Sequence, residues 1–231
     1  MARTTKTKPK EKPFPQREDI LAALGKAFDT VDAAIAKRRI STRVNLSSWS
    51  NMPALDNART AIGGLCEDLE LIENPEGEEE HPGAHRAIVM AFADPPGDVP
   101  RWSRPGTFLV WLDYVPIRCV WGGFADQSAM LFAADPDVPW VSGDGWWSLH
   151  FHGIEPGCRS VADTFRREIA NLGGPRARLE LKRLDDEAIE AARKTLALPE
   201  SEWLREALKR GPVDPVPLPQ HLQAVQQRLF A

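Results

Sequence analysis

Two histidines at alternate positions form the grouping with the most direct chemical meaning in the sequence. His150 and His152 follow the alternation WWSLHFH at 146–152, which is typical of a half-buried strand, so both imidazoles fall on one face. Glu155 could complete a set of nitrogen and oxygen ligands for a divalent metal ion, which would activate water for hydrolysis. The alternative interpretation is that both histidines lie on the polar face of an edge strand and bind nothing.

A second group of residues suits nucleic acid. Residues 176–184 alternate apolar and charged side chains, so a strand there would bury Leu179 and Leu181 and present Arg178 and Lys182 on its other face. Arginine and lysine on such a face can donate to guanine O6 and N7. The residues that we expect to contact nucleic acid are Arg178, Lys182, Arg183, Arg166 and Arg167.

The segment around these cations resembles a known DNA-binding module. A strand with RLELK at 178–182, a helix opening with LDDEAI at 184–189 and a second helix with SEWLREAL at 201–208 are similar to the ribbon-helix-helix domain of the Arc and MetJ type. The resemblance covers 176–210 and implies a homo-oligomer whose paired strands enter the major groove of double-stranded DNA. The alternative is an ordinary strand of the main sheet, followed by two helices that close the fold.

Tryptophan is concentrated in the middle of the chain. Six of the eight tryptophans fall between Trp102 and Trp147. They could fill the core of a sheet or form a platform on which planar rings stack. We favour core filling, because residues 101–147 hold only three arginines and a stacking surface normally mixes aromatic with basic residues.

Hydrophobic periodicity indicates the elements that position these residues. Apolar residues at helical spacing predict helices at 17–39, 53–72, 160–172, 186–197, 200–210 and 220–230. Ser160 and Asp163 approximate a capping box at the start of one of them. Short β-forming segments between turn residues predict five strands, at 86–93, 107–114, 117–121, 128–133 and 146–152, and a short strand lies within 40–46.

These elements predict an α+β fold with an N-terminal helical pair, a Trp-rich antiparallel sheet of about five strands and a helical C-terminal part. We divide the chain into a disordered basic arm (1–16), a helical segment (17–73), an acidic linker (74–84), a sheet with a helix (85–175), a strand-helix-helix unit (176–211), and a Pro-rich tail with a short helix (212–231). The tail could dock a protein partner.

Composition excludes several classes of protein. The net charge of −4 excludes a uniformly basic nucleic-acid coat, although the arm and the segment 158–183 are locally basic. No apolar run is long enough for a membrane span, and the N-terminus lacks the features of a secretory signal. Three separated cysteines (Cys66, Cys119, Cys158) argue against a disulfide scaffold and favour the cytoplasm.

Three functional hypotheses follow. The first is a non-enzymatic cytoplasmic binding protein without a cofactor, such as a DNA-binding regulator or accessory factor. The second is a metal-dependent hydrolase that uses His150 and His152. The third is an interaction module that acts through residues 212–231.

Overall fold

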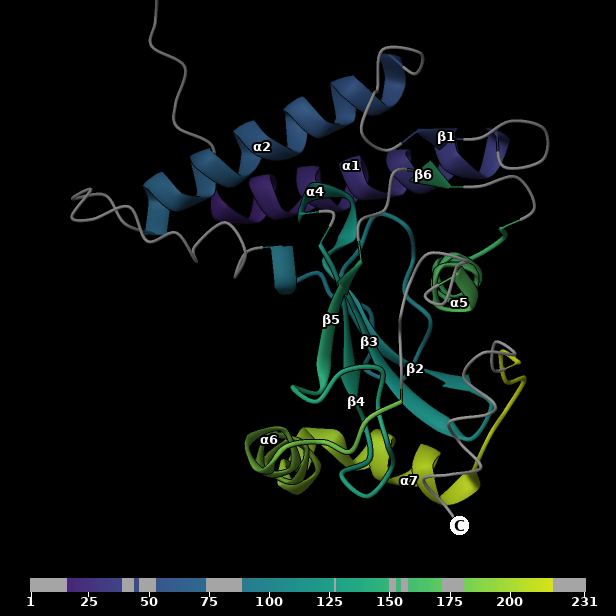
Figure 1. The fold of residues 1–231 in the computed structure, drawn as a ribbon. Helices are drawn as coiled ribbons and strands as arrows, with labels where there is room; N and C mark the ends of the chain where they lie inside the picture. Colours follow the sequence, from purple (N-terminus) through teal and green to yellow (C-terminus); the bar gives the residue numbers. More distant parts are fainter. Residues whose placement is uncertain are drawn as a thin grey trace, which may run out of the picture.

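A computed structural model describes residues 16–38, 44–45, 53–73, 89–126, 128–149, 153–154, 158–171 and 181–217. Helices at both ends of the sequence flank an antiparallel sheet, so the predicted α+β class is confirmed (Figure 1). This sheet has four strands rather than five. None of the described helices is both long and apolar enough to cross a membrane.

The sheet is a meander in which each strand pairs with the next along the chain. Its strands are β2 (Gly106–Leu112), β3 (Val115–Trp121), β4 (Ala129–Ala133) and β5 (Trp146–Leu149), in the order β2-β3-β4-β5, with the short helix α4 (Gly123–Asp126) between β3 and β4. The expected strand at 86–93 is wrong, because residues 89–90 are helical and 91–92 form a turn. A short apolar run does not distinguish a strand from a helical turn.

A second, two-stranded sheet joins distant parts of the chain. β1 (Val44–Asn45) pairs with β6 (Gly153–Ile154) in antiparallel orientation. The expected short strand within 40–46 is therefore confirmed at two of its residues.

The N-terminal helical pair consists of α1 (Arg17–Arg38) and α2 (Pro53–Glu73), which lie side by side at one end of the sheet (Figure 1). One stripe of α1 is fully buried, and its members are Ile20, Leu24, Phe28, Val31 and Ile35. Phe28 makes an edge-to-face contact with Phe92 at 5.3 Å between ring centroids. The predicted amphipathic stripe thus attaches the helical pair to the segment that precedes β2.

The inner face of the sheet belongs to the core. Phe108, Cys119 and Leu131 lie opposite one another on three neighbouring strands, and all are buried. Helix α5 (Val161–Asn171) packs on this face, where Phe165 contacts Phe108 at 5.1 Å between centroids. The predicted capping box at the start of α5 is confirmed: the Asp163 N–H donates to Ser160 Oγ at 3.1 Å, and the Ser160 N–H donates to Asp163 Oδ2 at 3.0 Å.

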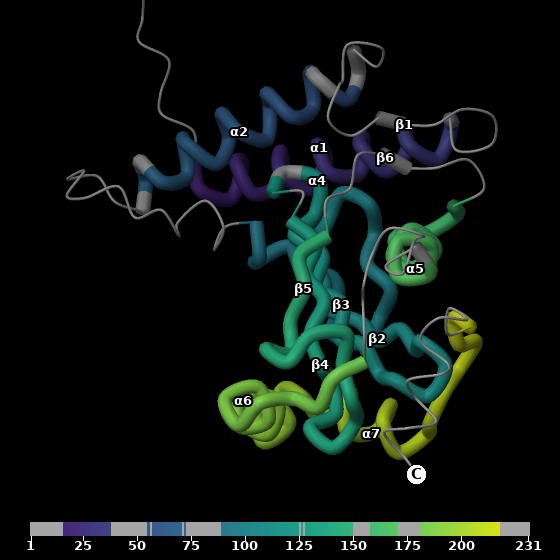
Figure 2. The backbone as a smooth tube through the Cα atoms, viewed as in Figure 1, coloured from purple at the N-terminus to yellow at the C-terminus, as the bar shows by residue number. Residues whose placement is uncertain are grey.

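Two C-terminal helices lie at the other end of the sheet. They are α6 (Asp186–Ala197) and α7 (Glu202–Arg210), joined through a 3-10 turn at Pro199–Ser201. The Asp185 carboxylate caps α6 by accepting from the Ala188 N–H at 2.8 Å, which explains why the predicted bounds of this helix are correct. Beyond α7 the chain runs back beside β2, where Val216 pairs with the strand (Figure 2).

Candidate functional site on the outer face of the sheet

The face of the sheet opposite α5 carries a row of four side chains, one from each strand. Leu109 lies opposite Arg118, which lies opposite Phe132, which lies opposite Trp146. We call these four residues the outer row. Leu109, Arg118 and Phe132 are half-buried, and Trp146 is 46% exposed. The outer row is thus the open counterpart of the buried Phe108–Cys119–Leu131 row on the inner face.

Arg118 occupies the middle of this row without a carboxylate partner. Its guanidinium carbon lies 4.3 Å from the centroid of the Phe132 ring, which is cation–π geometry. No carboxylate among the described residues pairs with it. Burial lowers the pKa of this guanidinium, although it remains charged at neutral pH. Because burial partly desolvates this cation, an anion or a planar ring at this position would be favourable.

The next row on the same face extends the open surface. It consists of Thr107, Val120, Met130 and Ser148, of which the first three are half-buried and Ser148 is exposed. The outer face therefore offers apolar area, an aromatic side chain open to solvent, and one guanidinium.

The tryptophans divide between the core and this surface. Trp111, Trp121 and Trp140 are buried, and Trp102 and Trp147 are partly buried against the core. The expectation of core filling is confirmed for four of these five; Trp111 is buried, but it lies on the same face of β2 as Leu109 and outside the main core cluster. Trp146 differs because it belongs to the outer row, where strand alternation turns it away from the core.

Two of the predicted nucleic-acid contacts, Lys182 and Arg183, are exposed beside the loop that joins β4 to β5. Lys182 exchanges two backbone hydrogen bonds with Trp140, at 2.7 and 2.9 Å, and the Asp185 N–H donates to the Gly143 carbonyl at 2.9 Å. The loop then returns to the sheet, where the Ala133 N–H donates to the Gly145 carbonyl at 2.8 Å. Lys182 and Arg183 thus lie at the end of the sheet that carries Phe132 and Trp146.

The backbone contacts between Lys182 and Trp140 also concern the predicted strand at 176–184. In a ribbon-helix-helix dimer the strand pairs with a second chain, whereas here Lys182 pairs with Trp140 of its own chain. Leu181 and Leu184 are buried in the core. Arg178 and the rest of 172–180 lie outside the described residues, and the ribbon-helix-helix assignment stays a prediction.

The remaining two predicted cations lie on α5. Arg166 is half-buried, with ion pairs to Asp163 at 3.6 Å and to Asp214 at 3.4 Å, so its charge is already compensated. Arg167 is exposed and has no ion pair with another described residue. No described contact joins either of them to Lys182 or Arg183, so these cations do not form one cluster.

The metal-binding hypothesis falls outside the described part of the chain, because His150, His152 and Glu155 are all in undescribed segments. Among the residues that the structure does describe, no group of three His, Cys, Asp or Glu side chains could hold a metal ion. The docking tail is described only as far as residue 217, and there Val216 covers an edge of the sheet.

The three thiols are free and buried. Burial, reinforced by Glu70 and Glu67, raises the pKa of Cys66 to about 11, and burial raises the pKa of Cys119 well above its usual value. Both are therefore protonated at neutral pH and poor nucleophiles. Cys158 lies just before α5, as expected.

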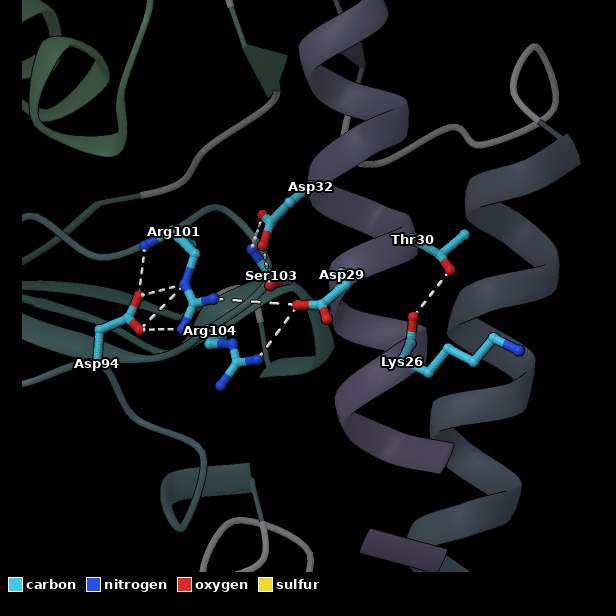
Figure 3. Close-up of polar contacts among 8 residues, drawn as sticks. All are labelled: Lys26, Asp29, Thr30, Asp32, Asp94, Arg101, Ser103 and Arg104. Atoms are coloured by element: carbon cyan, nitrogen blue, oxygen red, sulfur yellow. Dashed lines mark hydrogen bonds and ion pairs between the residues drawn. The ribbon is translucent and has the colours of Figure 1, made fainter. Parts of the chain in front are cut away.

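A polar cluster joins α1 to residues 94–104 (Figure 3). Asp94 accepts hydrogen bonds from the Arg101 backbone N–H at 2.7 Å and from the Arg101 guanidinium at 2.6 and 3.1 Å. On α1, Asp32 accepts from the Ser103 N–H at 2.9 Å and from Ser103 Oγ at 2.7 Å. We call these contacts the polar seam. Ser103 is fully buried, and both its N–H and its Oγ donate to Asp32, so this serine helps to attach α1 to the segment before β2.

Comparisons with family models, curated proteins and solved structures gave no match. The candidate site therefore rests on its own geometry. Sequence reasoning missed Arg118, although a signal was present. In the strand IRCVW at 117–121, alternation places the Arg118 side chain on the opposite face of the sheet from Ile117 and Cys119. A single cation in an otherwise apolar strand is unusual and singles out this position.

Proposed function

We propose that this chain is a non-enzymatic binding protein that holds single-stranded nucleic acid on the outer face of its sheet. The observation that carries the proposal is the outer row, in which Arg118 stacks on Phe132 with no acidic partner among the described residues and Trp146 is open to solvent. Antiparallel sheets that present aromatic side chains to unpaired bases are a recurrent means of binding single strands.

The cations near this surface support the same function. Bases stacked on Phe132 and Trp146 would leave their phosphates at the margin of the sheet, where Lys182 and Arg183 are exposed. Neither cation has an ion pair within the described part of the chain, so both remain available to phosphate. Double-stranded DNA hides the faces of its bases, and a stacking surface therefore favours single strands over duplexes.

The direct test measures binding of a fluorescent twelve-nucleotide oligothymidine by anisotropy, with the oligouridine of the same length and a duplex as further arms. Stacking on one aromatic side chain contributes about 1–3 kcal/mol, so Trp146→Ala should weaken binding at least about fivefold. Trp146→Phe keeps a stacking ring and should restore most of the affinity. Val213→Ala removes an exposed apolar side chain elsewhere and serves as the matched control.

The electrostatic part of the proposal has its own control. Lys182→Glu and Arg183→Glu should each weaken binding several-fold and reduce its salt dependence, because each removes one phosphate contact. Arg167→Glu makes the same change of charge at an exposed cation on α5 and should have a smaller effect. Equal losses at all three positions, an unaffected Trp146→Ala variant, or no binding at 50 mM salt would refute the proposal. Tighter binding of the duplex would favour the ribbon-helix-helix prediction instead.

A further inference from the structure

A second site, which shares Leu109 with the outer row, lies at the edge of the sheet formed by β2. β2 is an edge strand, and its own chain covers this edge at two positions. The Gly97 N–H donates to the Thr107 carbonyl at 2.8 Å, and the Val216 N–H donates to the Trp111 carbonyl at 2.7 Å. No described segment forms a backbone hydrogen bond with the stretch of edge between these two positions.

Leu109 lies in the middle of that stretch. The Thr107 and Trp111 carbonyls both point away from β3, and the period of two gives Leu109 the same orientation. Pro116, opposite Trp111, has no N–H to donate, which agrees with this pattern. Among the described residues no backbone group bonds to the Leu109 N–H or carbonyl from the edge side. One donor and one acceptor therefore face outward together.

Leu109 also lines a cavity of about 420 Å³, which we call the edge slot. Its walls come from the sheet, α7, α5 and the segment before β2, and they include Leu109, Trp111, Trp203, Asp98, Arg166 and Arg210. Trp203 lies so close to Gly97 that a Cβ atom there would come within 3.1 Å of its ring. Gly97 also has a φ of +96°, so this tight wall requires a glycine.

The covered positions limit the length of anything that binds. Thr107 and Trp111 are four positions apart along the strand, which corresponds to roughly 13 Å. A long strand added to the edge would collide with the segments at Gly97 and Val216. The edge slot therefore suits an extended ligand of only two or three residues.

The charged residues that line the slot indicate which groups the two ends of that ligand carry. Arg166 is paired with Asp163 and Asp214, and Glu206 is paired with Lys209 at 2.8 Å. Asp98 and Arg210 are exposed and have no ion pair with another described residue. Asp98 and Arg210 thus place one exposed charge of each sign beside the backbone donor and acceptor of Leu109, and Glu206 shares its charge between Lys209 and Arg210.

We propose that the edge slot binds a short zwitterionic peptide of two or three residues. Its backbone pairs with Leu109, its ammonium group with Asp98 and its carboxylate with Arg210, and its side chains pack against Trp111 and Trp203. This site needs no nucleic acid and is separate from Trp146 on β5.

The test is isothermal titration of the full chain with equimolar pools of unmodified dipeptides and tripeptides, followed by the individual members of any pool that binds. The same peptides with an acetylated N-terminus and an amidated C-terminus are the matched ligands, and we expect them to bind at least about tenfold more weakly. Asp98→Asn should abolish the preference for a free amine, and Arg210→Gln should abolish the preference for a free carboxylate.

A pair of substitutions at one position isolates the backbone contact. Leu109→Pro removes the N–H at an edge where proline is tolerated, whereas Leu109→Ala shortens the side chain and keeps the N–H. We expect Leu109→Pro to bind about tenfold more weakly than Leu109→Ala. Circular dichroism of both variants verifies folding, and Ala207→Trp, which fills the slot from α7, provides an independent loss of binding.

Several results would overturn this site. They are no heat from any pool at millimolar peptide, equal binding of the capped peptides, or equal binding of Leu109→Pro and Leu109→Ala. Trp146→Ala should leave peptide binding unchanged, so failure of the outer row and failure of the edge slot are distinguishable.

Discussion

Arg101 lies in the segment before β2, and Arg118 lies in β3. The two arginines have opposite surroundings. Arg101 donates two guanidinium hydrogen bonds to Asp94 and lies 3.9 Å from Asp29 on α1. Arg118 has the Phe132 ring beneath it and no described carboxylate beside it. The first charge is bound by a carboxylate of the segment before β2, whereas the described contact of the second is with an aromatic ring. The proposed ligand would supply Arg118 with the anionic or planar partner that no described carboxylate provides.

The pKa shifts follow the same division. Hydrogen bonding to Asp94 raises the pKa of Arg101, so the ionised form is favoured in the polar seam. Burial lowers the pKa of Arg118, so the ionised form is disfavoured in the outer row. Replacing residues in the two regions should therefore change stability in opposite directions.

The largest effect is expected in the polar seam. Asp94→Ala removes the acceptor for the Arg101 backbone and side chain and should lower the free energy of unfolding by about 2–3 kcal/mol. Urea denaturation measures this change. Asp98→Ala, an exposed carboxylate without an ion pair, should stay within about 0.5 kcal/mol of the parent. A loss at Asp94 no greater than that at Asp98 would show that the seam does not stabilise the fold.

A smaller effect of opposite sign is expected in the outer row. Arg118→Met keeps an unbranched side chain against Phe132 and removes the desolvated charge, so the free energy of unfolding should rise by up to about 1 kcal/mol. The same variant should bind oligothymidine more weakly. A destabilised Arg118→Met variant would mean that the guanidinium supports the fold, and the contrast between the two arginines would fail.

The smallest effects appear as pH dependence within the seam. Burial raises the pKa of Asp94, but its bonds from Arg101 outweigh burial and the pKa ends below its ordinary value of 3.8. Its contribution to stability is thus present above pH 3.8 and is lost as the pH falls through the lowered pKa. Burial raises the pKa of Asp32 above 3.8 despite the Ser103 bonds, so its contribution is present below pH 3.8 and is lost as the pH rises.

Urea denaturation between pH 2.5 and 6 of Asp94→Asn and Asp32→Asn checks these signs. The deficit of Asp94→Asn relative to the parent should shrink as the pH falls below 3.8. The deficit of Asp32→Asn should instead shrink as the pH rises above 3.8. Parallel curves for the two variants would contradict the assignment of opposite shifts.

Local signals predicted the elements where the responsible contacts are themselves local. The bounds of α6 follow from the Asp185 cap, and the start of α5 follows from Ser160 and Asp163, which lie three residues apart. The strand pattern from β2 to β5 was also readable, because each strand pairs with its neighbour in the sequence. The prediction of a strand at 86–93 failed because its apolar run fits a helical turn equally well.

Neither candidate site could be derived in this way. The outer row depends on the register of four strands, which places Arg118 between Leu109 and Phe132, and alternation within one strand does not give that register. The edge slot depends on Gly97 and Val216 approaching β2 from segments on either side of it in the sequence. Both sites form only when segments distant in the sequence pair in the folded chain, so their residues follow no regular spacing that the sequence alone would show.

The position of Val216 also means that its part of the β2 edge is covered late in synthesis. During synthesis the meander from β2 to β5 is complete long before Val216 leaves the ribosome, so the nascent chain carries a sheet with a partly bare edge. Bare strand edges pair readily with other chains. The segment after α7 therefore acts as a late closure, and the interval before it arrives is when the growing polypeptide is most exposed to aggregation.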